Sequence, residues 1–245
     1  MYRDYQPYQS VAARRAKGLA QLEKRGLGPL APVVIEGPRI ATTFWGKSWN
    51  ENLESYSDYA SRLPRGRTYV KNGSVANLRL EAGTVEAHVI GSELYTVDIG
   101  IEPISERRWA ALCADCSGSI DSLVELLQGQ FSDSVMKRLC AQGRGLFPTP
   151  EQIEFRCSCP DSAYMCKHIA AVLYGIGARL DHSPELLFTL RKVQLADLIA
   201  SANPRGLASS GKARRSELKK NELSALFGIE LGDAPAGKQR RPKRK

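Results

Sequence analysis

The chain has 245 residues, of which 42% are hydrophobic and 25% are charged, and its formal net charge is +9 at pH 7. This composition is ordinary for a soluble globular protein of one or two domains with a buried core. No stretch approaches the roughly 18 apolar residues of a membrane span, and residues 1–6 lack the apolar core of a signal peptide. We therefore expect no membrane association and a cytoplasmic location, with the nucleoid as an alternative, where thiols stay reduced.

The positive charge is concentrated at the two ends of the chain. Residues 1–30 hold 6 Lys and Arg against 2 Asp and Glu, whereas residues 205–245 hold 12 against 4. Residues 31–204 hold 17 against 20, so the body of the chain is slightly acidic. Basic ends of this kind attract polyanions by counterion release, and a solubilising terminus is an equally weighted alternative.

The N-terminal part of the chain is predicted to be a basic arm and linker, residues 1–38, followed by an aromatic helix. Residues 12–17 favour a short helix, and the Gly and Pro residues that follow are typical of a linker. A second helix is expected over residues 44–56. Its aromatic side chains Trp45, Trp49 and Tyr56 recur at helical spacing, which favours core packing over base stacking.

Alternating and β-branched residues then predict an antiparallel meander. The short turns Asn72-Gly73 and Ala82-Gly83 suit hairpins. The expected strands are residues 69–71, 74–81, 84–90 and 95–101.

Helical patterns dominate the second half of the chain, at residues 104–116, 121–128, 133–141, 169–174, 184–190 and 195–200. The predicted fold class is therefore α+β, with an antiparallel sheet in the N-terminal half and a mainly helical second half. We expect an α+β domain at residues 39–145 and a metal-binding region with packing helices at residues 146–203. A basic, largely disordered tail is expected at residues 204–245, and its apolar island at residues 223–231 suits a docking helix.

The most informative motif is Cys157-x-Cys159 followed by Cys166-x-His168. Three thiolates and an imidazole are the ligands that tetrahedral zinc prefers. Cys157 and Cys159 point to one face of an extended strand. Cys166 and His168 would lie roughly 200° apart on a regular helix, so we expect Cys166 in a loop and His168 in the first helical turn. Four protein ligands leave no open position, which predicts a structural Zn²⁺.

The other three cysteines, Cys113, Cys116 and Cys140, have no clear role in the sequence. Cys113 and Cys116 form a Cys-x-x-Cys pair inside an expected helix, which favours buried thiols over a second metal or redox site. No acid–base pair, nucleophile with a base, or carboxylate cluster stands out. We therefore predict that the protein is not an enzyme.

The Cys-x-Cys…Cys-x-His pattern resembles the SWIM-type zinc finger. Other segments are similar to the bacterial SWIM zinc finger family and extend the resemblance over about residues 13–200: residues 42–49, 62–69, 91–95, 145–148, 157–161 and 186–191. The resemblance implies a module for protein or DNA interaction, accessory to a helicase-like ATPase of the Swi/Snf type. One departure is Ser162, where many relatives carry Trp.

Stand-alone binding of DNA or RNA is the alternative function. Its candidate contacts are cations of an expected loop before the first strand, cations beside the metal, and cations of the tail. The loop could contact phosphates or be a solvated turn. The candidate residues are Arg62, Arg65, Arg67 and Lys71 in the loop, Arg156 and Lys167 beside the metal, and Arg240, Arg241, Lys243 and Arg244 in the tail.

Overall fold

The computed structural model describes residues 9–56, 60–117 and 132–202. The described residues all belong to one compact unit, residues 1–204. The helix expected at residues 121–128, the apolar island and the basic tail lie outside the described residues. The domain boundaries expected within residues 1–204 stay predictions.

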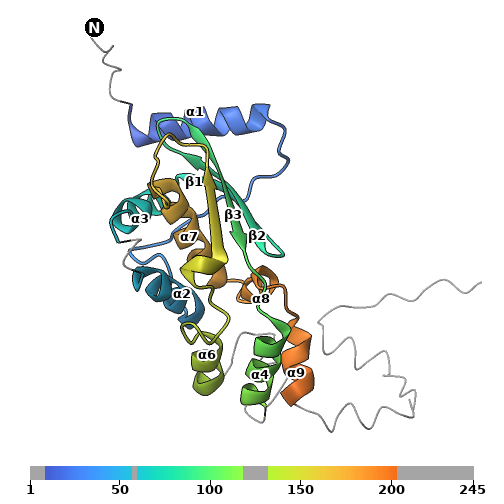
Figure 1. Ribbon diagram of the computed structural model, residues 1–245. Coiled ribbons are helices and arrows are strands. Elements are labelled where there is room, and N and C mark those ends of the chain that lie inside the picture. The colour runs from blue at the N-terminus through green and yellow to red at the C-terminus, as the bar shows by residue number, and fades with distance from the viewer. Residues whose placement is uncertain (1–8, 57–59, 118–131, 203–245) are drawn as a thin grey trace, which may run out of the picture. The chain divides into compact units, whose positions relative to one another are not determined.

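A four-stranded antiparallel sheet forms the centre of the described unit (Figure 1). Its strands follow the order β1 (Val75–Glu81), β2 (Thr84–Ile90), β3 (Leu94–Ile101) and β4 (Ile153–Cys157). The predicted meander corresponds to β1–β3, and β4 from the second half of the chain pairs with β3. The α+β fold class is confirmed.

Helices account for most of the remaining described chain. The helices expected around residues 44–56, 104–116, 133–141, 169–174, 184–190 and 195–200 are confirmed, and the first helix is longer than expected. The observed helices, of which α3 was not expected, are α1 (Val11–Lys24), α2 (Phe44–Glu54), α3 (Leu63–Lys71), α4 (Glu106–Cys116), α6 (Asp133–Leu139), α7 (Lys167–Leu180), α8 (Leu186–Leu190) and α9 (Leu195–Ala202). A 3₁₀ turn, η2, covers Pro150–Gln152.

The strand predicted at residues 69–71 is wrong, because these residues are the last turn of α3. Pro64 lies in the first turn of α3, where its fixed φ suits a helix, and Gly73 follows the helix with a φ of +64°. The β-branched character of Thr68 and Val70 is overridden because α3 packs along α7.

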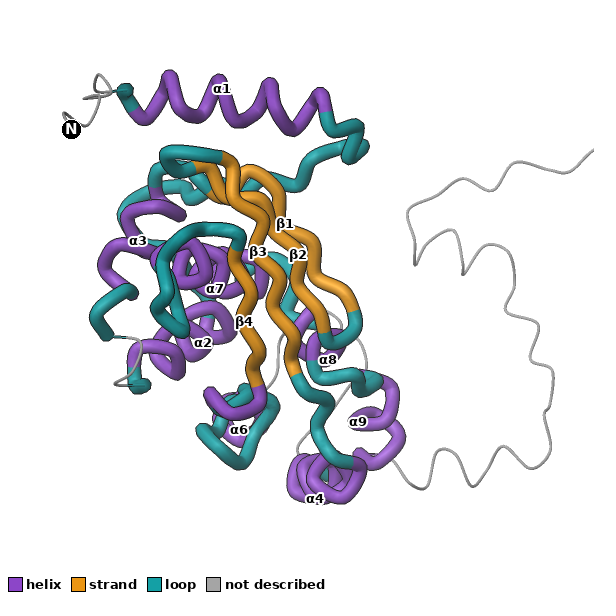
Figure 2. The backbone as a smooth tube through the Cα atoms, turned by 45° about the horizontal axis from the view of Figure 1, so that its top comes forward, coloured by secondary structure: helices purple, strands orange, loops and turns teal. Residues whose placement is uncertain are grey.

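One face of the sheet is covered by α7, which contacts all four strands (Figure 2). Helices α2 and α3 pack against α7, so α7 is buried almost along its whole length. The indole Nε1 of Trp49 donates to the carbonyl of Leu173 at 2.9 Å. Trp45 and Trp49 are both buried, which confirms that this aromatic helix serves the core.

The other face of the sheet is covered only in part by the described residues. Leu22 of α1 packs against Ala76 and Ile90 at one end of this face, and Figure 2 shows α1 beyond the upper end of the strands. The segment after α1 bonds to β1, where the amide of Val33 donates to the carbonyl of Val75 at 3.0 Å.

No helix among the described residues is long and apolar enough to span a membrane.

Candidate metal centre

The four ligand residues lie where β4 ends and α7 begins. Cys157 is the last residue of β4, and Cys159 follows two residues later. Cys166 is the N-cap of α7, and His168 lies in the first turn of that helix. The arrangement expected for Cys166 and His168 is therefore confirmed.

The ligand atoms of these four residues all lie within 4.8 Å of one another. The Nδ1 atom of His168 is 3.8 Å from the Sγ of Cys157 and 3.9 Å from the Sγ of Cys166. In tetrahedral zinc, bonds of about 2.3 Å to sulfur and about 2.0 Å to nitrogen place such atoms roughly 3.5–3.8 Å apart. The two observed separations are close to these values, so the cage fits a Zn²⁺ ion.

The electrostatics of the cage also suit a cation. The Cys157 thiol donates a hydrogen bond to the sulfur of Cys166, which lowers the pKa of Cys166 and raises the pKa of Cys157. Burial opposes the first shift and adds to the second, because it disfavours thiolates. Crowded sulfurs of this kind favour a divalent cation in place of a shared proton. The four residues are thus positioned to bind a zinc ion.

The imidazole of His168 is fixed by aromatic residues that the sequence did not reveal. The ring of Tyr95 on β3 stacks on it at 4.2 Å between centroids, and the ring of Tyr69 on α3 meets it edge-on at 5.4 Å. Gly91 lies beside the other ring nitrogen, since a Cβ at this position would be 3.0 Å from Nε2. Tyr69, Gly91 and Tyr95 fall in segments that resemble the SWIM family. This resemblance is the feature of the sequence that could have identified them.

The loop between the two ligand pairs is attached to both β4 and α3. The hydroxyl of Tyr164 donates to the carbonyl of Ile153 at 2.9 Å, and its ring meets Phe155 edge-on at 5.3 Å. Arg62 pairs with Asp161 at 3.3 Å. Tyr164 therefore supplies an aromatic contact in the loop where this chain has Ser162 instead of Trp.

Comparison with known protein families agrees with this geometry. The family model described as SWIM zinc finger matches residues 156–175. This range includes all four ligands and leaves out most of the surrounding sheet and helices. Residues 156–175 form a SWIM zinc finger. The finger is a binding module, and its Zn²⁺ site is built into the junction of β4 and α7.

The chain also has a bacterial relative. Uncharacterized protein Rv2102 of Mycobacterium tuberculosis is 33% identical over 165 residues, which are 66% of this chain. The alignment covers 59% of the length of that relative, so its whole-length properties do not transfer to this chain. No solved structure matches the chain.

Three cations proposed as nucleic-acid contacts also bond to other parts of the protein. Arg62 is the N-cap of α3, and Arg65, Arg67 and Lys71 lie in the helix, so the loop expected for these four residues is wrong. Arg62 bonds to the finger loop as described above. Arg67 pairs with Glu54 and donates to the Tyr174 hydroxyl at 3.2 Å. The ammonium of Lys71 donates to the Pro38 carbonyl at 2.6 Å.

The other candidate contacts are distributed over different surfaces. Arg65 is exposed on α3, on the helical side of the sheet. Lys167 lies over the ring of Tyr69 at 5.9 Å. Arg156 is exposed on β4 and faces away from α7, because it pairs in register with the exposed Asp98. Nucleic-acid binding by these residues stays a prediction, and the four cations of the tail lie outside the described residues.

Cys113 and Cys116 are buried in α4 within the hydrophobic core. Burial raises the pKa of both thiols, that of Cys116 to about 11, so both are protonated at neutral pH. Cys140, the C-cap of α6, is also kept protonated by burial. The three thiols thus have the character of small hydrophobic side chains.

Proposed function

We propose that this protein is a non-enzymatic interaction module that acts as an accessory to a helicase-like ATPase of the Swi/Snf type. The observation that carries the proposal is the position of the cage between β4 and α7. Zinc, when bound, stabilises the sheet–helix junction. Since four protein ligands complete its tetrahedral coordination, no position is left for water or substrate.

The charge distribution favours a protein partner for the described body. The unit of residues 1–204 is close to neutral, with 23 basic and 22 acidic residues counted from the sequence, so its net charge gives little attraction for a phosphate backbone. Arg62, Arg67 and Lys71 are engaged in contacts between elements of the fold. These features support docking on a protein as the main role of the folded unit.

An affinity purification tests this proposal. The tagged full-length protein is recovered from nuclease-treated lysate of its own cells, and the bound proteins are identified by mass spectrometry. We expect stoichiometric recovery of a helicase-like ATPase. Recovery of no ATPase, or recovery that disappears with nuclease treatment, would contradict the proposal.

A second candidate function is stand-alone binding of DNA or RNA. It is supported by the net charges of +4 in residues 1–30 and +8 in residues 205–245, counted from the sequence. The purification separates the two candidates, because partners of a nucleic-acid-binding protein are bridged by nucleic acid and are lost on nuclease treatment.

A further inference from the structure

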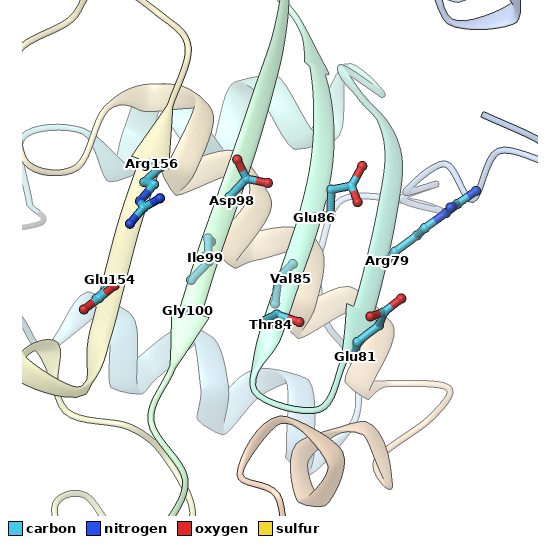
Figure 3. Close-up of a pocket in the computed structure, with 10 residues that line it drawn as sticks. All are labelled: Arg79, Glu81, Thr84, Val85, Glu86, Asp98, Ile99, Gly100, Glu154 and Arg156. Carbon is cyan, nitrogen blue, oxygen red and sulfur yellow. The ribbon is translucent and has the colours of Figure 1, made fainter. Parts of the chain in front are cut away.

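The face of the sheet that points away from α7 carries a trough of about 300 Å³. Its lining residues come from all four strands (Figure 3). The polar side chains project from the open side of the sheet, whereas Val85 and Ile99 alternate with them and belong to the buried core. Two rows of residues cross the strands here: Arg79, Glu86, Asp98 and Arg156 in one row, and Glu81, Thr84, Gly100 and Glu154 in the next.

The trough begins where the cover provided by α1 ends. His88, one position farther along this face of β2, is only 3% exposed, near the end of the sheet that Leu22 covers. Burial lowers the pKa of His88, in agreement with a covered site. Glu86, next on the same face, is exposed, as are Asp98 and Glu154 on the neighbouring strands. The sheet face is therefore partly covered and partly open.

Gly100 makes the floor of the trough lower than the rest of the face. A glycine inside a strand costs roughly 0.5–1 kcal/mol relative to alanine. The fold does not require it here, because a Cβ at this position would meet its nearest atom, the Cβ of Glu154, at an ordinary 3.6 Å. Gly100 also lacks the positive φ that favours glycine at other positions. Glycines of this kind mark places where a ligand or another chain comes close to the backbone.

The charges of the trough indicate the sign of its ligand. Glu86 and Asp98 are directly opposite in the β2–β3 register, an arrangement in which like charges destabilise a sheet. Glu81 and Glu154 add two carboxylates, against the guanidinium groups of Arg79 and Arg156 on the outer strands. The guanidinium of Arg79 is turned toward the chain after α1, where it donates to the carbonyl of Leu27 at 2.7 Å.

We propose that this trough binds a short arginine- or lysine-rich segment of a partner protein. The apolar stem of one basic side chain lies over Gly100, and its charged group pairs with Glu86 and Asp98. The four carboxylates outnumber the two guanidinium groups, so the trough repels nucleic-acid phosphates, and its open shape can accommodate an extended peptide. The inference rests on the proposed function, because it names the surface on which the partner docks.

The test measures fluorescence anisotropy of a labelled octa-arginine peptide with the full-length protein at low salt. Wild type should bind it, and both Gly100→Val and the double variant Glu86→Gln/Asp98→Asn should bind at least about tenfold more weakly. Gly100→Val should melt at the same temperature as wild type or higher, because valine favours strands. Gly100→Ala provides a smaller filling of the same floor and should give an intermediate loss.

The matched control is Glu36→Gln/Glu51→Gln, which removes two exposed carboxylates outside the trough. It should bind the peptide like wild type. Equal binding by the control and by Glu86→Gln/Asp98→Asn would overturn the proposal, because the peptide would then sense only net charge. Absence of wild-type binding, unchanged binding by Gly100→Val, or preference for an octa-glutamate peptide or a single-stranded oligonucleotide would also overturn it.

The affinity purification distinguishes a failure of this inference from a failure of the proposed function. If wild type and Gly100→Val recover the same ATPase equally, the accessory role stands and the trough is not its docking site. If neither recovers an ATPase but the peptide binds with the expected variant pattern, the trough stands and the identity of the partner is wrong.

Discussion

His168 connects the metal cage to two elements that lie far away in the sequence. Its ring contacts Tyr95 of β3 and Tyr69 of α3, while Cys166, two residues earlier, is the N-cap of α7. Packing of this kind restricts the ring orientation, as neighbours of metal ligands commonly do. Zinc binding is therefore coupled to the positions of the sheet and of α3, beyond the short finger itself.

Substitution Cys159→Ser removes one of the three sulfur ligands. We expect the bound zinc to fall from one ion per chain to near zero, with faster hydrogen exchange over residues 150–190 and a lower melting temperature. The physical reason is that zinc binding contributes about 10–16 kcal/mol to the folding free energy of small finger peptides. This is comparable to the net stability of a whole domain, about 5–15 kcal/mol.

Elemental analysis and differential scanning calorimetry measure these effects. Cys140→Ser is the control, since Cys140 caps α6 and is not a member of the ligand group. A Cys159→Ser protein with wild-type zinc content and melting temperature would show that the metal is not structural.

At the scale of elements, α7 is the helix against which α2 and α3 pack. The carboxylate of Asp181, just after α7, accepts hydrogen bonds from the amides and hydroxyls of Thr42 and Thr43 before α2. On the other side, Gly66 lets α3 approach α7 so closely that a Cβ there would lie 2.4 Å from the Cβ of Ala170. Since Ala170 lies two residues after His168, this contact also places α3 at the metal site.

Gly66→Ala should therefore force α3 away from α7. We expect a loss of about 1–3 kcal/mol in the free energy of unfolding, the usual cost of overpacking. Loss of zinc to a chelator should also be faster, because Tyr69 on α3 moves with the helix. Urea unfolding and chelator kinetics measure the two effects.

Gly100→Ala is the matched control, because its Cβ has room and its strand position favours a side chain. It should leave stability unchanged or raise it by roughly 0.5–1 kcal/mol. The same sign of effect for both glycines would contradict this account of the α3–α7 contact.

At the scale of the whole molecule, charge is segregated between a slightly acidic body and basic ends. Electrostatic attraction of nucleic acid by such ends depends steeply on salt. The described body contributes exposed cations on different faces, Arg65 on α3 and Arg156 on β4. We expect any affinity for nucleic acid to depend mainly on the ends.

Replacement of Arg240, Arg241, Lys243 and Arg244 by Gln in the full chain tests this expectation. The slope of log affinity for duplex DNA against log salt should become shallower by about 3–4, since each phosphate contact contributes roughly 0.9. Arg65→Gln/Arg156→Gln is the comparison and should change the slope little. A larger change in the comparison protein would assign the binding to the folded body.

The sequence alone determined the metal ligands, most of the helices and the β1–β3 meander. These features depend on local chemistry: thiolates and imidazole at fixed spacing, helical periodicity, and alternation interrupted by short turns. Only the tertiary structure decided that residues 69–71 are helical, that β4 completes the sheet, and that Tyr69 and Tyr95 hold His168. It also decided that Arg62, Arg67 and Lys71 bond within the protein and that Gly100 opens a trough. The reason is that packing between distant segments outweighs the small differences in local backbone preference.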